Sequence, residues 1–142
     1  VVQGGGYTTG LVKKAGQAAP IALESQNGLS NLRGTLAMAR TNDPQSATAQ
    51  FFINVKDNDF LNPTPIPAGD PVARFEYQGR VYENVPRANL LAAPQLFGYV
   101  AFGKVISGTE VVDAITELPT GRRGFHDDVP KEDVVIEKAV AL

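Results

Sequence analysis

Apolar and polar residues alternate along several short stretches of the chain, which predicts β-strands. In residues 34–40, Leu36 and Met38 fall on one face of such a strand, while Thr35, Ala37 and Ala39 fall on the other. Residues 50–55, QFFINV, are rich in aromatic and β-branched side chains. Further strand candidates are residues 20–24, 98–105 and the mostly apolar closing segment 133–142.

Helical periodicity is clear in one segment, residues 107–118. Three apolar residues recur there at helical spacing, namely Val111, Ile115 and Leu118. Ser107 followed by Glu110 has the capping-box pattern of a helix start. Many short strands, one helix and no alternation of strand and helix predict a mostly β fold, an antiparallel barrel or sandwich with a helix against it.

The character of the sequence changes between residues 62 and 97, where six of the ten prolines lie. Such a proline density rules out a continuous helix or a central strand. Within it, residues 74–83 predict a small hairpin turning at Gln78-Gly79, and residues 90–93 predict a helical turn. We interpret residues 62–97, called the insert below, as one long loop inserted in a single domain that spans residues 1–142.

Composition narrows the range of functions. The net charge is −2, and the Lys and Arg residues are scattered, so nothing indicates binding to nucleic acid. No cysteine is present, which excludes thiol catalysis, disulfides and thiolate metal sites. The single histidine, His126, is predicted to be a surface loop residue, and no metal or cofactor site is expected. No apolar stretch approaches the ~18 residues of a membrane span.

The chain opens on Val1-Val2, which resembles the end of a strand rather than its beginning. We therefore expect it to be a fragment or a processed product. Any signal peptide would lie upstream of Val1, so the bacterial periplasm and the cytoplasm both stay open as compartments.

A candidate binding surface lies in residues 46–62. Alternation along a strand places Gln50 and Phe52 on one face, and Phe51, Ile53 and Val55 on the other. The second face is a plausible core. An amide beside an aromatic ring suits a wall that binds peptides, because the ring supplies apolar contact and the amide bonds a carbonyl. From the pattern alone, however, a purely structural role in the core is the favoured interpretation.

Five segments resemble a known family, the bacterial kind of cyclophilin-type peptidyl-prolyl isomerases, in order and in spacing. They are VVQGGGYT (1–8), GTLAMART (34–41), SATAQFFINVKDNDFLN (46–62), GYVAFGKVISG (98–108) and VVIEKAV (134–140). The resemblance implies an eight-stranded antiparallel barrel capped by two helices. It also implies an enzyme that isomerises X–Pro bonds, assists folding, uses no cofactor, and acts on proline-containing peptides and unfolded chains.

The resemblance also implies roles for individual residues. Gln3 and Gln50 would hydrogen-bond the peptide around the X–Pro amide. The proline ring would be held by Phe52, Phe60 and Leu61. Three further residues would line the groove: Ala39 and Arg40, mainly through backbone, and Tyr99, where many relatives carry histidine. Phe60 replaces the tryptophan of well-studied eukaryotic members, so cyclosporin binding is expected to be weak.

Two residues of the family pattern are absent from the chain, an essential arginine and a pocket phenylalanine just after it. The family's essential arginine precedes the Gln-Gly-Gly motif by a few residues, and only two residues stand before Gln3. The first strands and the first capping helix are expected to be missing with it, which would leave the barrel incomplete at its N-terminal side. An alternative therefore stays open, a proline-peptide-binding or chaperone module without catalysis.

Overall fold

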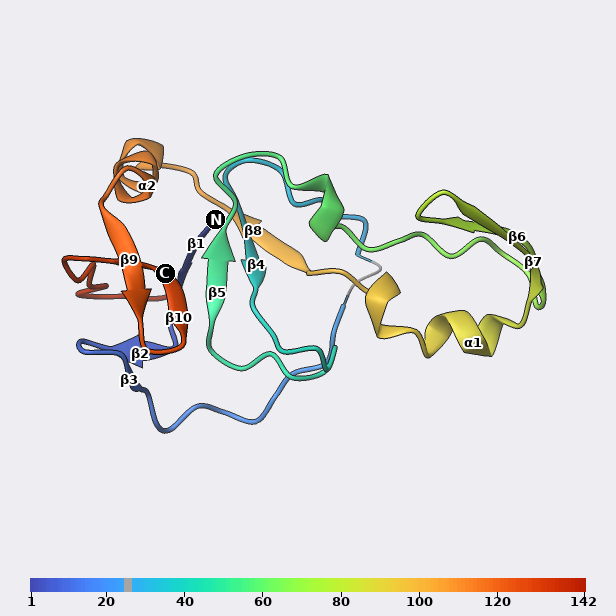
Figure 1. The fold of residues 1–142 in the computed structure, drawn as a ribbon, viewed down its shortest axis with the longest axis horizontal. Coiled ribbons are helices and arrows are strands. Elements are labelled where there is room, and N and C mark those ends of the chain that lie inside the picture. The colour runs from blue at the N-terminus through green and yellow to red at the C-terminus, as the bar shows by residue number, and fades with distance from the viewer. Residues whose placement is uncertain (25–26) are drawn as a thin grey trace.

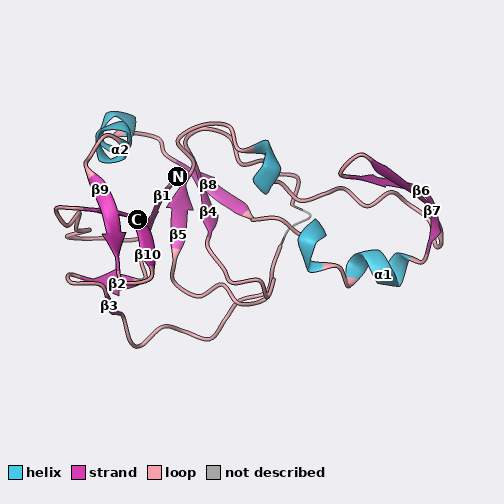
Figure 2. Ribbon diagram, in the orientation of Figure 1, coloured by secondary structure: helices cyan, strands magenta, loops and turns pink. Residues whose placement is uncertain are grey.

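The computed structural model describes residues 1–24 and 27–142 and consists mainly of short antiparallel strands (Figure 1, Figure 2). Four of them form a central sheet in the order β1 (Val2–Gly4), β5 (Phe51–Ile53), β4 (Thr35–Met38) and β8 (Ala101–Lys104). Three hairpins accompany it: β2 (Tyr7–Thr8) with β3 (Val12–Lys13), β6 (Val72–Tyr77) with β7 (Arg80–Val85), and β9 (Thr120–Arg123) with β10 (His126–Pro130). The mostly β, antiparallel class is thus confirmed.

One row of residues crosses the central sheet on a single face. Gln3 lies opposite Phe52, Phe52 opposite Ala37, and Ala37 opposite Ala101. Residues directly opposite one another in antiparallel strands point to the same side. Phe52, Ala37 and Ala101 are buried, and we call this side the Phe52 face.

The structure corrects the predicted division between core and surface in β5. Phe51, Ile53 and Val55, expected to be the core, are only half-buried, whereas Phe52 is 4 % exposed. Alternation does place the two sets on opposite faces, as predicted. It could not show that small alanines and a tyrosine from elsewhere in the chain would enclose the Phe52 ring.

The predicted helix is present as α2 (Thr109–Thr116), but its start differs from the prediction. The residue that caps it is Gly108, with φ +85°, and no side chain caps this end, so Ser107 does not form a capping box. Glu110 still lies in the first turn, where a negative charge favours the helix dipole. Arg33 ties α2 to the sheet, because its Nη2 lies 2.9 Å from Asp113 Oδ2.

The insert is an ordered unit rather than the expected loop. Its hairpin turns at Gln78 and Gly79, both with positive φ, as predicted. After β7 come α1 (Arg87–Leu91) and a 3₁₀ turn (Pro94–Leu96), which confirms helical structure near residue 90. Four buried residues form a core within this unit: Val72, Phe75, Leu90 and Leu96. Figure 1 shows the insert extending away from the central sheet.

Two other expectations need correction or qualification. Residues 131–142 form no strand, and Ile136 is 58 % exposed, because an apolar segment becomes a strand only where a partner edge receives it. In the segment 20–24 only Ile21 pairs, through a single bridge to Ala47. Among the residues that the structure describes, β1 and β8 are the edges of the central sheet, and the barrel was expected to be incomplete. No helix in that part of the chain is long and apolar enough to cross a membrane.

Candidate functional site

Two glutamines meet on the Phe52 face at the edge of the central sheet. Gln3 comes from β1 and Gln50 directly precedes β5, and the Gln3 Nε2 donates to the Gln50 Oε1 at 3.0 Å. Because the Gln50 oxygen accepts this bond, its amide nitrogen keeps its two hydrogens to donate elsewhere. The sequence prediction paired these residues, and the structure brings them together.

Gly6 makes room for the Gln50 side chain. A Cβ added at residue 6 would lie 2.5 Å from the Gln50 Cδ and 2.8 Å from its Nε2. Gly6 is buried and has no positive φ, so space rather than backbone conformation requires glycine there. Gly6, the last residue of the Gly-Gly-Gly run after Gln3, thus leaves the space that the Gln50 amide occupies, a role that the sequence analysis missed.

Phe52 is covered by Tyr99, which lies two residues before the start of β8. The ring centroids lie 5.7 Å apart with an interplanar angle of 76°, an edge-on contact typical of aromatic pairs. Phe52 is consequently buried, while Tyr99 stays half-exposed. Both Phe52 and Tyr99 were predicted to line the groove. A ligand can contact the Tyr99 ring directly, whereas it can reach the Phe52 ring only if Tyr99 moves.

Phe60 and Leu61 lie on a single 3₁₀ turn (Asp59–Leu61). The Phe60 side chain is 81 % exposed, and Leu61 is half-buried. The backbone of Leu61 is joined to the opposite segment, because the Tyr99 N–H donates to the Leu61 carbonyl at 2.9 Å. Leu61 is thus fixed beside Tyr99, whereas the Phe60 ring is presented to solvent.

Four asparagines hold this turn, three of them buried and Asn62 half-buried, and sequence reasoning did not single them out. The four, called the asparagine network below, are Asn31, Asn54, Asn58 and Asn62. Asn31 is fully buried, and its Nδ2 donates to the Asn62 Oδ1 and to the Tyr99 carbonyl, each at 3.1 Å. Asn54 donates to Asn31, and Asn58 donates to Asn54. A fully bonded buried network of this kind fixes geometry, because any rearrangement leaves a polar group unpaired.

The predicted groove residues Ala39 and Arg40 follow β4. The Ala39 N–H donates to the Gln50 carbonyl at 3.0 Å, so this donor is already used within the protein. The Arg40 side chain folds back onto the chain, and its Nη2 donates to the Gly98 carbonyl at 2.6 Å. A contact between a ligand and the backbone of these residues remains a prediction.

His126 lies in β10 rather than in the loop expected from the sequence. Its ring contacts the Tyr7 ring edge-on, with centroids 5.1 Å apart. Within residues 1–24 and 27–142, no group of three or more potential metal ligands is found.

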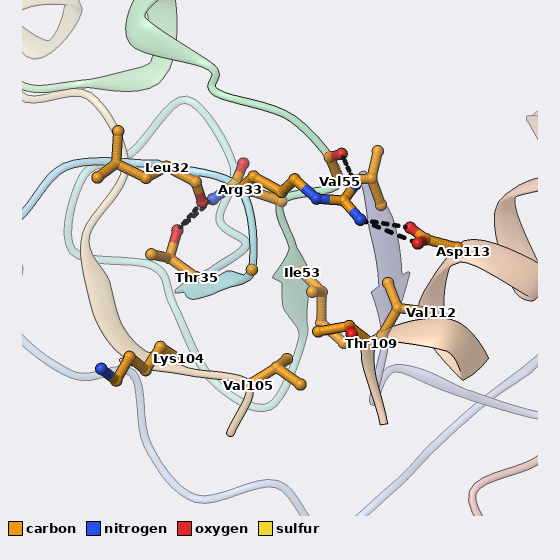
Figure 3. A pocket seen from close by; sticks show the side chains of 12 residues that line it. Leu32, Arg33, Thr35, Ile53, Val55, Lys104, Val105, Thr109, Val112 and Asp113 are labelled. Atoms are coloured by element: carbon orange, nitrogen blue, oxygen red, sulfur yellow. Dashed lines mark hydrogen bonds and ion pairs between the residues drawn. The ribbon is translucent and has the colours of Figure 1, made fainter. Parts of the chain in front are cut away.

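A cavity of about 330 Å³ lies between the central sheet and α2 (Figure 3). It is lined in part by Thr35, Ile53 and Val112, and by the ion pair of Arg33 with Asp113. None of the predicted site residues lines it, and Ile53 belongs to the face opposite Phe52. This cavity is therefore not the predicted peptide groove.

Comparison with known proteins bears directly on these residues. Residues 1–141 match the model of the family "Cyclophilin type peptidyl-prolyl cis-trans isomerase/CLD". The chain is 47 % identical over 137 residues to peptidyl-prolyl cis-trans isomerase B of Escherichia coli, which covers 96 % of this chain and 67 % of that protein. It is 46 % identical over 136 residues to a peptidyl-prolyl cis-trans isomerase of Acinetobacter baylyi, covering 96 % and 56 % respectively.

The match extends over the central sheet and every residue of the predicted groove, and the named relatives are bacterial isomerases. The chain spans 67 % and 56 % of the length of these two relatives. The chain therefore belongs to the cyclophilin-type family of peptidyl-prolyl cis-trans isomerases, as the sequence resemblance predicted.

Proposed function

We propose that the protein containing this chain accelerates rotation about X–Pro bonds, and that its substrate lies along the Phe52 face between the glutamine pair and Tyr99. The observation that carries this proposal is the Gln3–Gln50 hydrogen bond beside Phe52, which leaves an oriented amide donor next to an aromatic surface. Unfolded chains and proline-containing peptides are the substrates that such a surface suits, because it offers a carbonyl partner and an apolar contact.

The chemistry requires stabilisation of a twisted amide. Resonance keeps the bond planar against a barrier of about 18–20 kcal/mol. Both isomers of X–Pro are populated, yet uncatalysed exchange takes tens to hundreds of seconds, so rotation itself is the slow step. A protein lowers the barrier by binding the twisted state better than either planar state. Neither a nucleophile nor a cofactor is required by such a mechanism.

Each part of the groove has a role in this scheme. The Gln50 amide donates to the carbonyl of the residue before proline and restrains that side of the bond. Tyr99, Leu61 and the exposed Phe60 give the proline ring an apolar contact on the other side. Because the donors are already fixed by Gln3 and Gly6, little reorganisation accompanies the reaction.

The position of Gln50 can be tested by adding one methyl group. We expect Gly6→Ala to lower kcat/KM for a short Xaa-Pro peptide by about tenfold, equivalent to about 1.4 kcal/mol of transition-state stabilisation. The reason is that the new Cβ occupies the space of the Gln50 amide. Gly4→Ala is the matched control, since a Cβ there makes only ordinary contacts at 3.8 Å. The measurement is a protease-coupled isomerisation assay on the full-length protein.

The outcomes of that assay separate the claims. A folded wild-type protein that gives no acceleration contradicts isomerase activity, and peptide binding by calorimetry would then support the non-catalytic module. Activity that is unchanged by Gly6→Ala removes Gln50 from the mechanism but leaves the activity standing. Equal losses in Gly6→Ala and Gly4→Ala would point to damage of β1 rather than to the amide.

We also propose that the insert is an appended unit that isomerisation of short peptides does not require. Its core is internal, and its two ends are adjacent, because the Thr64 N–H donates to the Leu96 carbonyl at 2.8 Å. Closely spaced ends allow a loop to be shortened without moving its attachment points.

Replacing residues 65–95 by a single glycine should therefore leave kcat/KM for a tetrapeptide within about threefold of the wild-type value, because surface insertions carry little of a domain's stability. The companion variant Phe75→Ala keeps the length but removes a ring from the insert's core. Loss of tetrapeptide activity in both variants would show that the insert belongs to the site. Loss with a protein substrate alone would assign it a role in binding larger substrates.

A further inference from the structure

Arg40 makes an unusual set of contacts for a half-exposed arginine. Its Nε and Nη2 both donate to the Gly98 carbonyl, at 3.2 and 2.6 Å, and its Nη1 donates to the Thr41 carbonyl at 2.8 Å. Its Cζ lies 4.7 Å from the centroid of the Tyr99 ring. None of the ion pairs among residues 1–24 and 27–142 includes Arg40.

These contacts differ from those of a solvated surface charge. Arg74, by comparison, approaches Glu76 at 3.8 Å with both side chains largely exposed. The Arg40 guanidinium instead combines a fork on one carbonyl with stacking on an aromatic ring. Only a planar guanidinium can do both at once, since an ammonium group has neither the fork nor the flat face. The arrangement is specific to arginine.

Tyr99 is the residue that these contacts restrain. Its backbone is already held on both sides, by its N–H bond to the Leu61 carbonyl and by the bond that its own carbonyl accepts from Asn31. Its ring remains free to rotate about the side-chain bonds unless other groups hold it. The Arg40 guanidinium covers the ring, and Phe52 meets it edge-on.

We infer that Arg40 is a positioning residue, which holds the Tyr99 ring against Phe52 so that the ring forms a fixed wall for the substrate's proline. Arg40 acts through Tyr99 and does not touch the prolyl amide. This inference rests on the proposed isomerase site and extends it, because the family resemblance assigned Arg40 contact with substrate mainly through its backbone. It also gives a role to the two hydrogen bonds from Arg40 to the Gly98 carbonyl, because Gly98 lies between the end of the insert and Tyr99.

The first test compares Arg40→Ala with Arg33→Ala. Arg33 is a matched control because it too bonds a backbone carbonyl, that of Val55, and bridges two segments, but at the α2 side of the sheet. We expect Arg40→Ala to raise KM for a short Xaa-Pro peptide about fivefold with kcat within about twofold, since a loosened wall weakens proline binding. Arg33→Ala should leave KM within about twofold of wild type.

A second measurement reads the Tyr99 ring directly and does not depend on activity. The protein is labelled on its four tyrosines for NMR, and the Tyr99 signal is assigned with Tyr99→Phe. Arg40→Ala should shift or broaden that signal and leave those of Tyr77 and Tyr82 in place. Arg33→Ala should leave all of them in place. An unshifted Tyr99 signal in folded Arg40→Ala overturns the inference, whether or not the wild-type protein is an active isomerase.

The double variant decides whether Arg40 works through Tyr99. In a Tyr99→Ala background, Arg40→Ala should change KM by less than about twofold, because the ring that it positions is gone. Effects that multiply instead would show that Arg40 acts independently and would overturn the inference. Arg40→Lys keeps the positive charge and provides a second route if Arg40→Ala fails to fold. Arg40→Lys should raise KM and should shift the Tyr99 signal in the same direction as Arg40→Ala does. If KM and the Tyr99 signal of Arg40→Lys both equal those of the wild-type protein, the role of the planar guanidinium is contradicted.

Discussion

Replacing Asn31 by aspartate should destabilise the protein by about 3 kcal/mol and weaken isomerisation with it. The change keeps the shape of the side chain but removes the Nδ2 donor that Asn62 and the Tyr99 carbonyl share. Asn31 is fully buried, so water cannot replace the lost bonds, and the new carboxylate would face two oxygens.

The activity of Asn31→Asp should fall for a separate reason. The asparagine network holds the turn that carries Phe60 and Leu61 next to Tyr99, so its loss would move two sides of the proposed proline site at once. Urea unfolding would measure the stability, and the peptide assay well below the melting temperature would measure kcat/KM.

An exposed asparagine serves as the control for this experiment. Asn42→Asp lies on the surface and should change the free energy of unfolding by less than about 0.5 kcal/mol. If the urea midpoint of unfolding for Asn31→Asp equals that of the wild-type protein, the stabilising role of the asparagine network is contradicted.

Gly98→Ala is expected to be a strongly damaging substitution near the site. Gly98 has φ +58°, and a Cβ there would lie 2.6 Å from the Leu61 carbonyl and 2.7 Å from the backbone of Pro63. These neighbours are backbone atoms, so they cannot move aside as a flexible side chain would. The bond from the Tyr99 N–H to that same carbonyl would be displaced. We expect a loss of about 2–3 kcal/mol in stability and more than about tenfold in kcat/KM.

Gly103→Ala is the matched control for this change. It lies on β8 in open space, with nothing near the added Cβ and no positive φ. Denaturation of the two variants side by side separates the close approach at residue 98 from a general cost of replacing glycine. If Gly98→Ala retains both the stability and the activity of Gly103→Ala, the tight contact between the two ends of the insert has no functional importance.

The sequence predicted the local elements of this fold well. Alternation placed the strands that became β4, β5 and β8, and helical spacing placed α2. The hairpin of the insert was predicted to turn at Gln78-Gly79, where both residues have positive φ. These features follow from neighbours within a few residues, whose side-chain spacing and backbone preferences are visible in the chain itself.

Expectations that depended on a distant partner were less successful. The closing strand at residues 133–142 is not formed, and the capping residue of α2 is Gly108 instead of Ser107. A period of two identifies a face that suits a sheet, but it does not supply the edge that the strand must join. The start of a helix likewise depends on the backbone path of the preceding residues, which a capping-box pattern in the sequence does not show.

What the sequence determined by itself was the family and the strands that became β4, β5 and β8, and it supplied the groove residues, from Gln3 and Gln50 to Tyr99, as a prediction. Only the tertiary structure decided how these residues are held. It buried Phe52 beneath Tyr99, set Gln50 over Gly6, joined Asn31 to Asn62 and turned Arg40 back onto Gly98. The physical reason is that these contacts join residues 31 to 58 positions apart, or depend on space that one chain segment leaves for another. Spacing along the chain carries no information on such contacts until the sheet and its turns are assembled.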